Sequence, residues 1–128
     1  MLKFFNIAIG GAVGALLRYW VSGLTYRFFS GGFPWGTLSV NLVGSLLIGL
    51  FWGMFDSITI SQNLKLFIFI GLLGSFTTFS TFSLENFHLL RDGEYWFIFY
   101  NITLSLILGI GLVAIGFFTS KLFMGILK

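Results

Sequence analysis

A run of hydroxyl and phenyl groups interrupts an otherwise apolar part of the chain. Residues 74–83 read GSFTTFSTFS and lie within the apolar stretch 64–90. Hydrocarbon offers no partner to a hydroxyl group, so the five Thr and Ser residues at 77–83 must face one another, water or an ion. Phe76, Phe79 and Phe82 share the run, and a phenyl ring has a positive edge. Hydroxyl groups and ring edges together can hold a small anion.

A second interpretation of residues 74–83 is open. The Ser and Thr hydroxyls can donate back to carbonyls four residues earlier, while the rings pack against lipid or a neighbouring helix. Any single hydroxyl is readily satisfied in this way. The density of the whole block favours the ion path.

The composition is that of a membrane protein. The chain has 128 residues, of which 57% are hydrophobic and 9% charged, which is too apolar for a soluble domain and too short for several domains. A helix needs about 20 apolar residues to cross about 30 Å of hydrocarbon, which predicts four transmembrane helices at residues 4–25, 37–55, 64–90 and 95–124. We therefore expect one all-α domain over residues 1–128, multi-pass in the inner or plasma membrane. The first segment is expected to be retained rather than cleaved, since it is long and contains Arg18.

The residue types exclude several functions. The chain has no cysteine and one histidine, His88, so a thiol nucleophile and a zinc centre are not expected. His88 and Glu85 have no nucleophile or metal partner in sight, which argues against an enzyme. The basic residues are scattered rather than clustered, so no nucleic-acid partner is expected.

The charge distribution leaves the orientation in the membrane open. With four spans, lysines lie on the side of the N-terminus and arginines toward the other: Lys3, Lys65, Lys121 and Lys128 against Arg18, Arg27 and Arg91. Orientation follows the excess of Lys and Arg on the cytoplasmic side, so this balance permits both orientations and an antiparallel dimer. A single orientation set by the first helix is the alternative.

Small residues recur at intervals of four in the predicted helices. The sets are Gly10 with Gly14, Gly11 with Ala15, Ser45 with Gly49 and Gly53, and Ser105 with Gly109. Such spacing lets helix backbones approach closely. It predicts a compact bundle, an oligomer, and a pore between subunits rather than through one.

Polar residues form stripes on two helices. Thr37, Asn41 and Ser45 recur every four residues, as do Asn101 and Ser105. Either asparagine can instead hydrogen-bond between helices and hold them together. Two polar stripes that face a hydroxyl-rich third helix favour an ion pathway.

The third segment is longer than one straight span requires. Gly71 and Gly74 precede the hydroxyl run, and a break there would free backbone carbonyls for a cation. The alternative is a tilted, continuous helix.

Three segments carry a resemblance to a known family. They are the first-helix pattern from Gly10-Gly11 through Gly14-Ala15 to Arg18, the GTLSVNLVG of residues 36–44, and the GSFTTFSTFSLE of residues 74–85. Together they resemble the Fluc family of fluoride channels, also called CrcB-type proteins. The likeness covers the whole chain in length and helix count.

The resemblance implies a dual-topology, antiparallel homodimer with two pores that passively export fluoride from the cytoplasm and relieve its toxicity. Phe79 and Phe82 are similar to the paired pore phenylalanines, and Asn41 to the pore asparagine. The remaining positions that it implies are a polar track of Thr37, Ser80, Thr81 and Glu85, Ser105 on the fourth helix, Arg18 near the pore entrance, and the carbonyls of Gly74 and Thr77 around a structural Na⁺ at the dimer axis. Gly109 and Ser75 depart from the family pattern, which leaves the outer pore lining open.

Two other function classes are alternatives to a fluoride channel. A small four-helix, dual-topology multidrug exporter needs a titratable group deep in the membrane, whereas the only acidic residue in a predicted span, Glu85, lies near its end. In a non-transporting scaffold protein, all of these polar residues would serve only to hold helices together.

Overall fold

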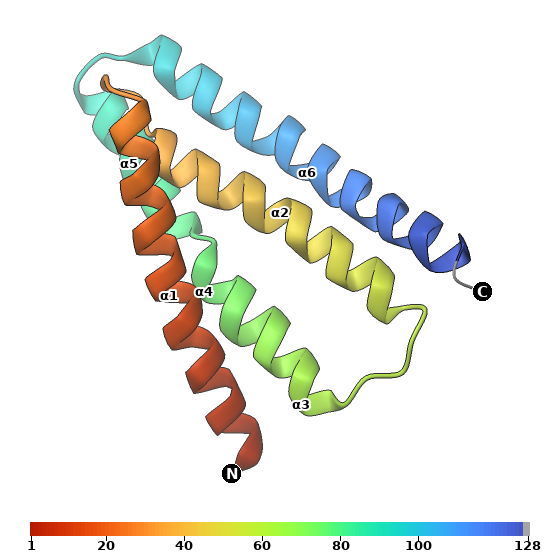
Figure 1. The fold of residues 1–128 in the computed structure, drawn as a ribbon. Helices are drawn as coiled ribbons and strands as arrows, with labels where there is room; N and C mark the ends of the chain where they lie inside the picture. Colours follow the sequence, from red (N-terminus) through yellow and green to blue (C-terminus); the bar gives the residue numbers. More distant parts are fainter. Residues whose placement is uncertain (127–128) are drawn as a thin grey trace.

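The computed structural model describes residues 1–126, which contain helices and no strand. Figure 1 shows their course. The helices are α1 (Leu2–Phe28), α2 (Trp35–Phe55), α3 (Gln62–Lys65), the π-helical η1 (Leu66–Leu73), α4 (Gly74–Phe76), α5 (Phe79–Arg91) and α6 (Tyr95–Ile126).

Four stretches of helix are long and apolar enough to cross a membrane. They are Leu2–Phe28, Trp35–Phe55, Gln62–Arg91 and Tyr95–Ile126. The prediction of four transmembrane helices is thus confirmed, and the first and last described residues lie toward the same end of the bundle (Figure 1). Lys128, placed by charge at this end, lies outside the described residues.

The helices α2 and α6 run in the same direction and pack closely. Their register is constant: the rings of Phe33 and Phe97 lie 5.7 Å apart between centroids near one end, and a Cβ added to Gly109 would lie 3.6 Å from Ser45 Oγ. Further along, Gly49 lies against the backbone of Val113. Each contact joins residues 64 positions apart, so the glycines permit backbone contact along the whole pair.

A second close pair joins α1 to the first half of the third span. A Cβ added to Gly71 would lie 2.9 Å from Gly10 Cα, and Gly14 lies against the carbonyl of Leu72. The small residues at positions 10, 14, 49 and 53 therefore lie at helix contacts, as their spacing predicts. Gly11 has only Ser75 Oγ nearby, at 3.3 Å from an added Cβ.

The third span is broken near its middle, as expected. Gly71 and Gly74 are helical, and the backbone becomes extended at Thr77 (φ −83°, ψ 160°) and Thr78 (φ −150°, ψ 121°). Gly71 serves the contact with α1, and the Thr pair at the break has partners for the freed backbone groups. A broken rather than continuous helix is confirmed.

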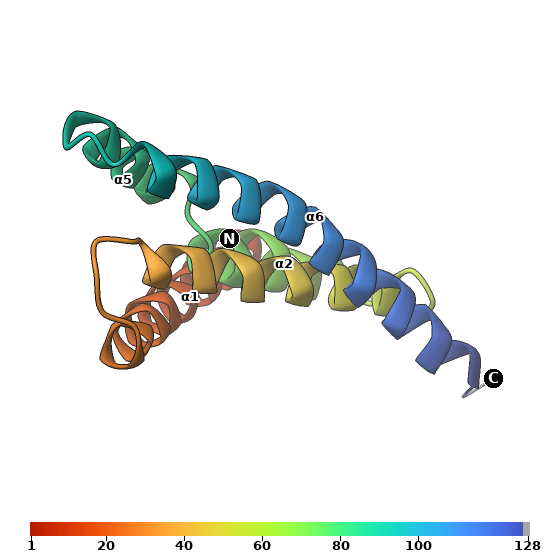
Figure 2. The ribbon, with the colours of Figure 1, turned by 90° about the horizontal axis from the view of Figure 1, so that it is seen from above.

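The four spans form an open arrangement rather than a closed ring. Among residues 1–126, α6 contacts only α2 and α5, while α1 contacts α2 and the third span. Viewed from above, α2 lies between α1 and α6 (Figure 2). This openness leaves hollows on both sides of the break.

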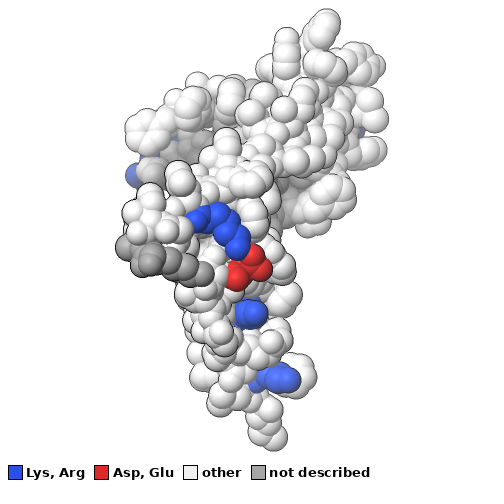
Figure 3. All heavy atoms as spheres, turned by 90° about the vertical axis from the view of Figure 1, so that its right-hand side faces the viewer, with Lys and Arg blue, Asp and Glu red and all other residues white. Residues whose placement is uncertain are grey.

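The outer surface suits a lipid environment. Charged atoms are few on the face drawn in Figure 3, and large apolar side chains such as Phe4, Trp96 and Phe118 are exposed. At one end, Lys121 of α6 donates to the Asp56 carboxylate and also to Ser57, 3.4 Å away, just after α2. This pairing ties the two parallel helices together where they leave the apolar region.

Candidate functional site

The break in the third span is held by one side chain of α2. Asn41 Oδ1 accepts a hydrogen bond of 2.8 Å from the Thr78 N–H, and Asn41 Nδ2 donates one of 3.1 Å to the Thr78 carbonyl. Thr78 is 8% exposed, so both backbone groups would otherwise be buried without partners. The Asn41 amide thus replaces the helical bonds that the break removes.

The hydroxyl groups after the break cap the second half of the span. Thr78 Oγ1 accepts a 3.2 Å bond from the Thr81 N–H and donates a 3.0 Å bond to Thr81 Oγ1. Ser80 Oγ lies 3.4 Å from Thr78 Oγ1. Such a side-chain cap satisfies one of the free N–H groups at a helix start, so Thr78 begins α5.

Two other hydroxyls in the run behave as the alternative interpretation expects. Thr77 Oγ1 donates 3.0 Å to the Leu73 carbonyl, and Ser83 Oγ donates 2.9 Å to the Phe79 carbonyl, each four residues earlier. The run is therefore divided: its outer hydroxyls bond their own helix, and its central hydroxyls bond one another.

The break also removes the usual donors from two carbonyl groups. The helical donor to the Gly74 carbonyl would be the Thr78 N–H, which instead bonds Asn41. The helical donor to the Thr77 carbonyl would be the Thr81 N–H, which instead bonds Thr78 Oγ1. Gly74 is exposed on the protomer surface. Neutral carbonyl oxygens of this kind fit a monovalent cation such as Na⁺, the ligand type expected at these two residues.

A cavity of about 370 Å³ lies beside the break, between α2 and α6. Asn41, Phe79, Phe82 and Ser105, all predicted to line an anion path, meet on its wall. The ring centroids of Phe79 and Phe82 are 5.9 Å apart, and Phe79 is 80% exposed. A side chain so exposed is available to lipid or to another molecule.

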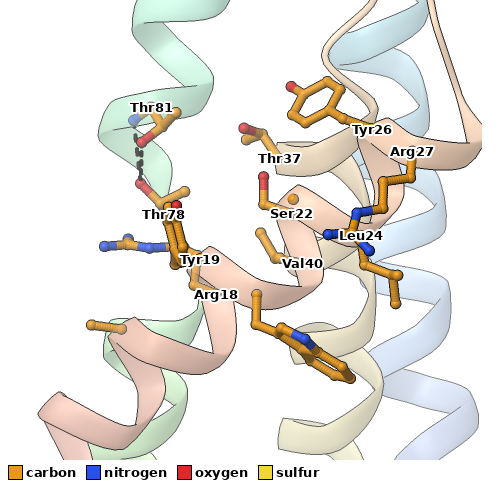
Figure 4. A pocket seen from close by; sticks show the side chains of 13 residues that line it. Arg18, Tyr19, Ser22, Leu24, Tyr26, Arg27, Thr37, Val40, Thr78 and Thr81 are labelled. Atoms are coloured by element: carbon orange, nitrogen blue, oxygen red, sulfur yellow. Dashed lines mark hydrogen bonds between the residues drawn. The ribbon is translucent and has the colours of Figure 1, made fainter.

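A second cavity, of about 600 Å³, lies on the other side of α2, against α1. Figure 4 shows Arg18 and Arg27 of α1 together with Thr37, Thr78 and Thr81 around it. Arg18 is the residue predicted near a pore entrance, and Thr37 and Thr81 belong to the predicted polar track. Arg27 had no predicted role. It lies nine residues, or about two and a half turns, after Arg18, so helical spacing alone does not place the two side chains together.

Thr78 lines both cavities. The Thr78–Asn41 contact therefore separates a cavity with arginines on its wall from a cavity lined by phenyl rings, an amide and a hydroxyl. Sequence reasoning did not single out Thr78. A Thr directly before a helix segment is the N-cap signal that identifies it.

Glu85 completes the predicted set and points away from open solvent. Thr37 Oγ1 donates a 2.6 Å bond to Glu85 Oε1, and Thr37 is 4% exposed. The second carboxylate oxygen, Oε2, is buried without a hydrogen-bond partner among residues 1–126. Ser80 lies on the exposed side of α5. The assignment of these residues to an ion path stays a prediction.

The chain is similar to known proteins over nearly its whole length. A family model described as "CrcB-like protein, Camphor Resistance (CrcB)" matches residues 5–117. A protein of Desulfotalea psychrophila named "Fluoride-specific ion channel FluC" is 48% identical over 124 residues, which is 97% of this chain and 96% of that protein. A protein of Salinibacter ruber with the same name is 49% identical over 116 residues, 91% of this chain and 87% of that protein.

A third relative with that name, from Parabacteroides distasonis, is 44% identical over 121 residues, 94% of each chain. The family-model match covers the whole second and third spans, with the broken helix, and most of the first and fourth. Identity at this level over this share of both chains means a common fold as well as a common origin. The chain belongs to the CrcB-like family.

Proposed function

We infer that this protein is a fluoride-selective ion channel in the cell membrane. The observation that carries the inference is the near-complete match, at 44–49% identity, to three proteins named as fluoride-specific ion channels. The four apolar spans agree with a multi-pass membrane protein. A passive channel is not an enzyme, and its physiological use would be to release fluoride from the cytoplasm and relieve its toxicity.

We propose that the anion passes the cavity lined by Asn41, Phe79 and Phe82. Fluoride is small and strongly hydrated, so a conducting site must replace its water with several weak donors rather than one fixed charge. Asn41 Nδ2 carries two hydrogens, of which the Thr78 carbonyl accepts one. The second hydrogen and the positive ring edges provide donors of the required kind.

The proposed path continues along hydroxyl groups toward the arginine-lined cavity. Thr37 and Thr81 line the arginine-lined cavity, Ser80 lies beside Thr78, and Ser105 lines the phenyl-lined cavity. Arg18 lies on the wall of the wider cavity, where a solvated cation raises the local concentration of anions without holding them. Attraction at the entrance and weak donors at the narrow part suit conduction.

A second copy of the chain would complete this site. Phe79 is 80% exposed, and Gly74 is exposed too. Both line the same cavity, so a neighbouring chain can contact both. We propose an antiparallel, dual-topology homodimer with two pores, supported by the near balance of Lys and Arg between the two ends. The freed carbonyls of Gly74 and Thr77 from both copies would hold a structural Na⁺ at the axis.

A proton-coupled multidrug exporter is not favoured. Such a transporter needs a titratable group deep in the membrane. Of the acidic residues, only Glu85 lies within a span, two turns from the end of α5, and Thr37 already bonds it. The three relatives described above are named as ion channels.

Ion efflux from liposomes tests the proposed function. Purified protein is placed in liposomes loaded with potassium fluoride or potassium chloride, and efflux is followed with ion-selective electrodes after valinomycin is added. Rapid fluoride efflux with retained chloride is expected. Empty liposomes are the control, and protein-containing liposomes that retain fluoride would contradict the proposal.

A further inference from the structure

Asn101 is the most deeply buried polar side chain that the structure describes. Its exposure is 0%, yet neither Oδ1 nor Nδ2 has a hydrogen-bond partner within residues 1–126. An amide that is buried unpaired is costly, and a well-packed apolar residue would avoid the cost. We therefore expect the Asn101 amide to have a hydrogen-bond partner.

The constant register of α2 and α6 fixes the level of Asn101. Because the contacts along this pair join residues 64 positions apart, from Phe33 and Phe97 to Gly49 and Val113, Asn101 lies level with Thr37. Thr37 is the residue that bonds Glu85 Oε1.

The hairpin of α5 and α6 leads to the same level. Glu85 lies six residues before the end of α5 at Arg91, and Asn101 lies six residues after the start of α6 at Tyr95. The two helices contact one another and a three-residue connection joins them. Two independent registers therefore bring Thr37, Glu85 and Asn101 into one layer.

The unpaired atoms of this layer are complementary. Glu85 Oε2 is a buried acceptor, and Asn101 Nδ2 is a buried donor. One turn further along α6, the Ser105 hydroxyl is likewise buried without a partner. A single water can join two or more such groups when they are too far apart for a direct bond.

We propose that Asn101 is a positioning residue for Glu85. Its amide, joined to Glu85 Oε2 through one buried water, holds the carboxylate against Thr37 and away from the anion. The proposal rests on the fluoride path inferred above, because an anion that passes Asn41 and Ser105 is repelled by a carboxylate that turns toward it. Removal of the amide frees the carboxylate to turn.

A double-mutant cycle on fluoride flux tests the proposal. Asn101→Leu keeps a similar volume and removes the amide, and it should lower fluoride efflux from liposomes by about tenfold in the native background. In the Glu85→Gln background the same change should alter efflux by less than about twofold, because the charge that Asn101 restrains is gone. Ser120→Ala, which also changes a buried polar residue of α6, should leave efflux unchanged in both backgrounds.

An infrared signature separates positioning from packing. The carboxylate stretch of Glu85, isolated as the difference between the native protein and Glu85→Gln, should shift in Asn101→Leu and be unmoved in Ser120→Ala. If Asn101→Leu does not give a monodisperse protein, Asn101→Ser is measured in its place. Equal losses of flux in both backgrounds, or an unshifted carboxylate band, would overturn the proposal. Absent fluoride flux in the native protein would instead overturn the proposed function.

Discussion

The Asn41 side chain forms two hydrogen bonds with the backbone of Thr78, across from one helix to the break in another. One amide therefore supplies both the donor and the acceptor that a residue in a helix normally finds in its own chain. The same amide has a second N–H hydrogen, and Asn41 lines the cavity with Phe79 and Phe82. Structural support and proposed ion binding thus depend on a single side chain.

Replacement of Asn41 is expected to affect both stability and flux. In Asn41→Leu the buried Thr78 N–H and carbonyl lose their partners, which should destabilise the fold by about 1–3 kcal/mol. Fluoride efflux should fall at least about tenfold. Chemical unfolding and liposome efflux measure the two effects. Asn6→Leu is the control, because it makes the same chemical change where the side-chain hydrogen bond is exposed. An Asn41→Leu protein more stable than the native one would show that the two bonds to Thr78 do not stabilise the break.

The rings at the cavity can be tested without loss of bulk. Phe82→Ile removes the positive ring edge and keeps an apolar side chain of similar reach, so fluoride efflux should fall at least about tenfold while the protein still elutes as the native oligomer. Phe118→Ile changes a ring exposed on α6 and should conduct normally. Undiminished efflux through a well-folded Phe82→Ile protein would remove the rings from the ion path.

The glycines of the paired helices make opposite predictions. A Cβ at Gly49 meets the backbone of Val113, so Gly49→Ala should destabilise the protein by about 1–3 kcal/mol through overpacking. Gly111 lies in the partner helix, α6, and no atom lies within 4 Å of a Cβ added to it. Gly111→Ala should therefore be neutral or stabilise by up to about 1 kcal/mol, since Ala favours helix. Thermal unfolding in detergent compares the two variants, and equal effects would refute the close contact.

The dual-topology proposal predicts labelling from both sides of the membrane. A single cysteine at Lys3, near one end of the bundle, or at Gly93, in the connection between α5 and α6, is treated with an impermeant thiol reagent in intact cells and in inverted vesicles. Because the chain has no native cysteine, each label reports one position. About half of each variant should react from either side, and reaction from one side alone would show a fixed orientation.

The pairing of Asp56 with Lys121 predicts a small dependence of stability on pH. The hydrogen bond from Lys121 lowers the pKa of Asp56 below its ordinary value of 3.8. A carboxylate with a lowered pKa contributes stability above its ordinary pKa and loses it as the pH falls through the lowered value. The melting temperature of the native protein should therefore exceed that of Asp56→Asn slightly at pH 7 and match it well below pH 3.8. A gap that persists in acid would assign the effect to packing; the exposure of the pair keeps the gap small.

The sequence predicted the spans well because twenty apolar residues in a row leave few alternatives to a membrane helix. The close contacts at Gly10, Gly14 and Gly49 followed from spacing for the same reason, since only small residues allow them. A break near the middle of the third span also followed, but the contact that holds it did not. Gly71 and Gly74 are locally flexible, but Asn41 decides where the backbone groups find partners, and that contact joins residues 37 positions apart.

The register that places Asn101 at the same level as Thr37 likewise could not be predicted from the polar pattern of one helix. Thr37, Asn41 and Ser45 predict which face of α2 is polar, whereas the level of α6 beside it depends on glycine contacts at Gly49 and Gly109. Patterns within one helix follow from its sequence. Offsets between helices follow from packing.

Because a side chain of α2 holds the break, the third span on its own keeps the Thr78 cap but lacks partners for the Thr78 N–H and carbonyl. Since α2 precedes residues 77 and 78 in the chain, Asn41 reaches the membrane before they do. Synthesis order thus favours the bent form over the straight one. A peptide of residues 62–91 alone, or a chain whose third span precedes its second, should insert straight and fold slowly or not at all.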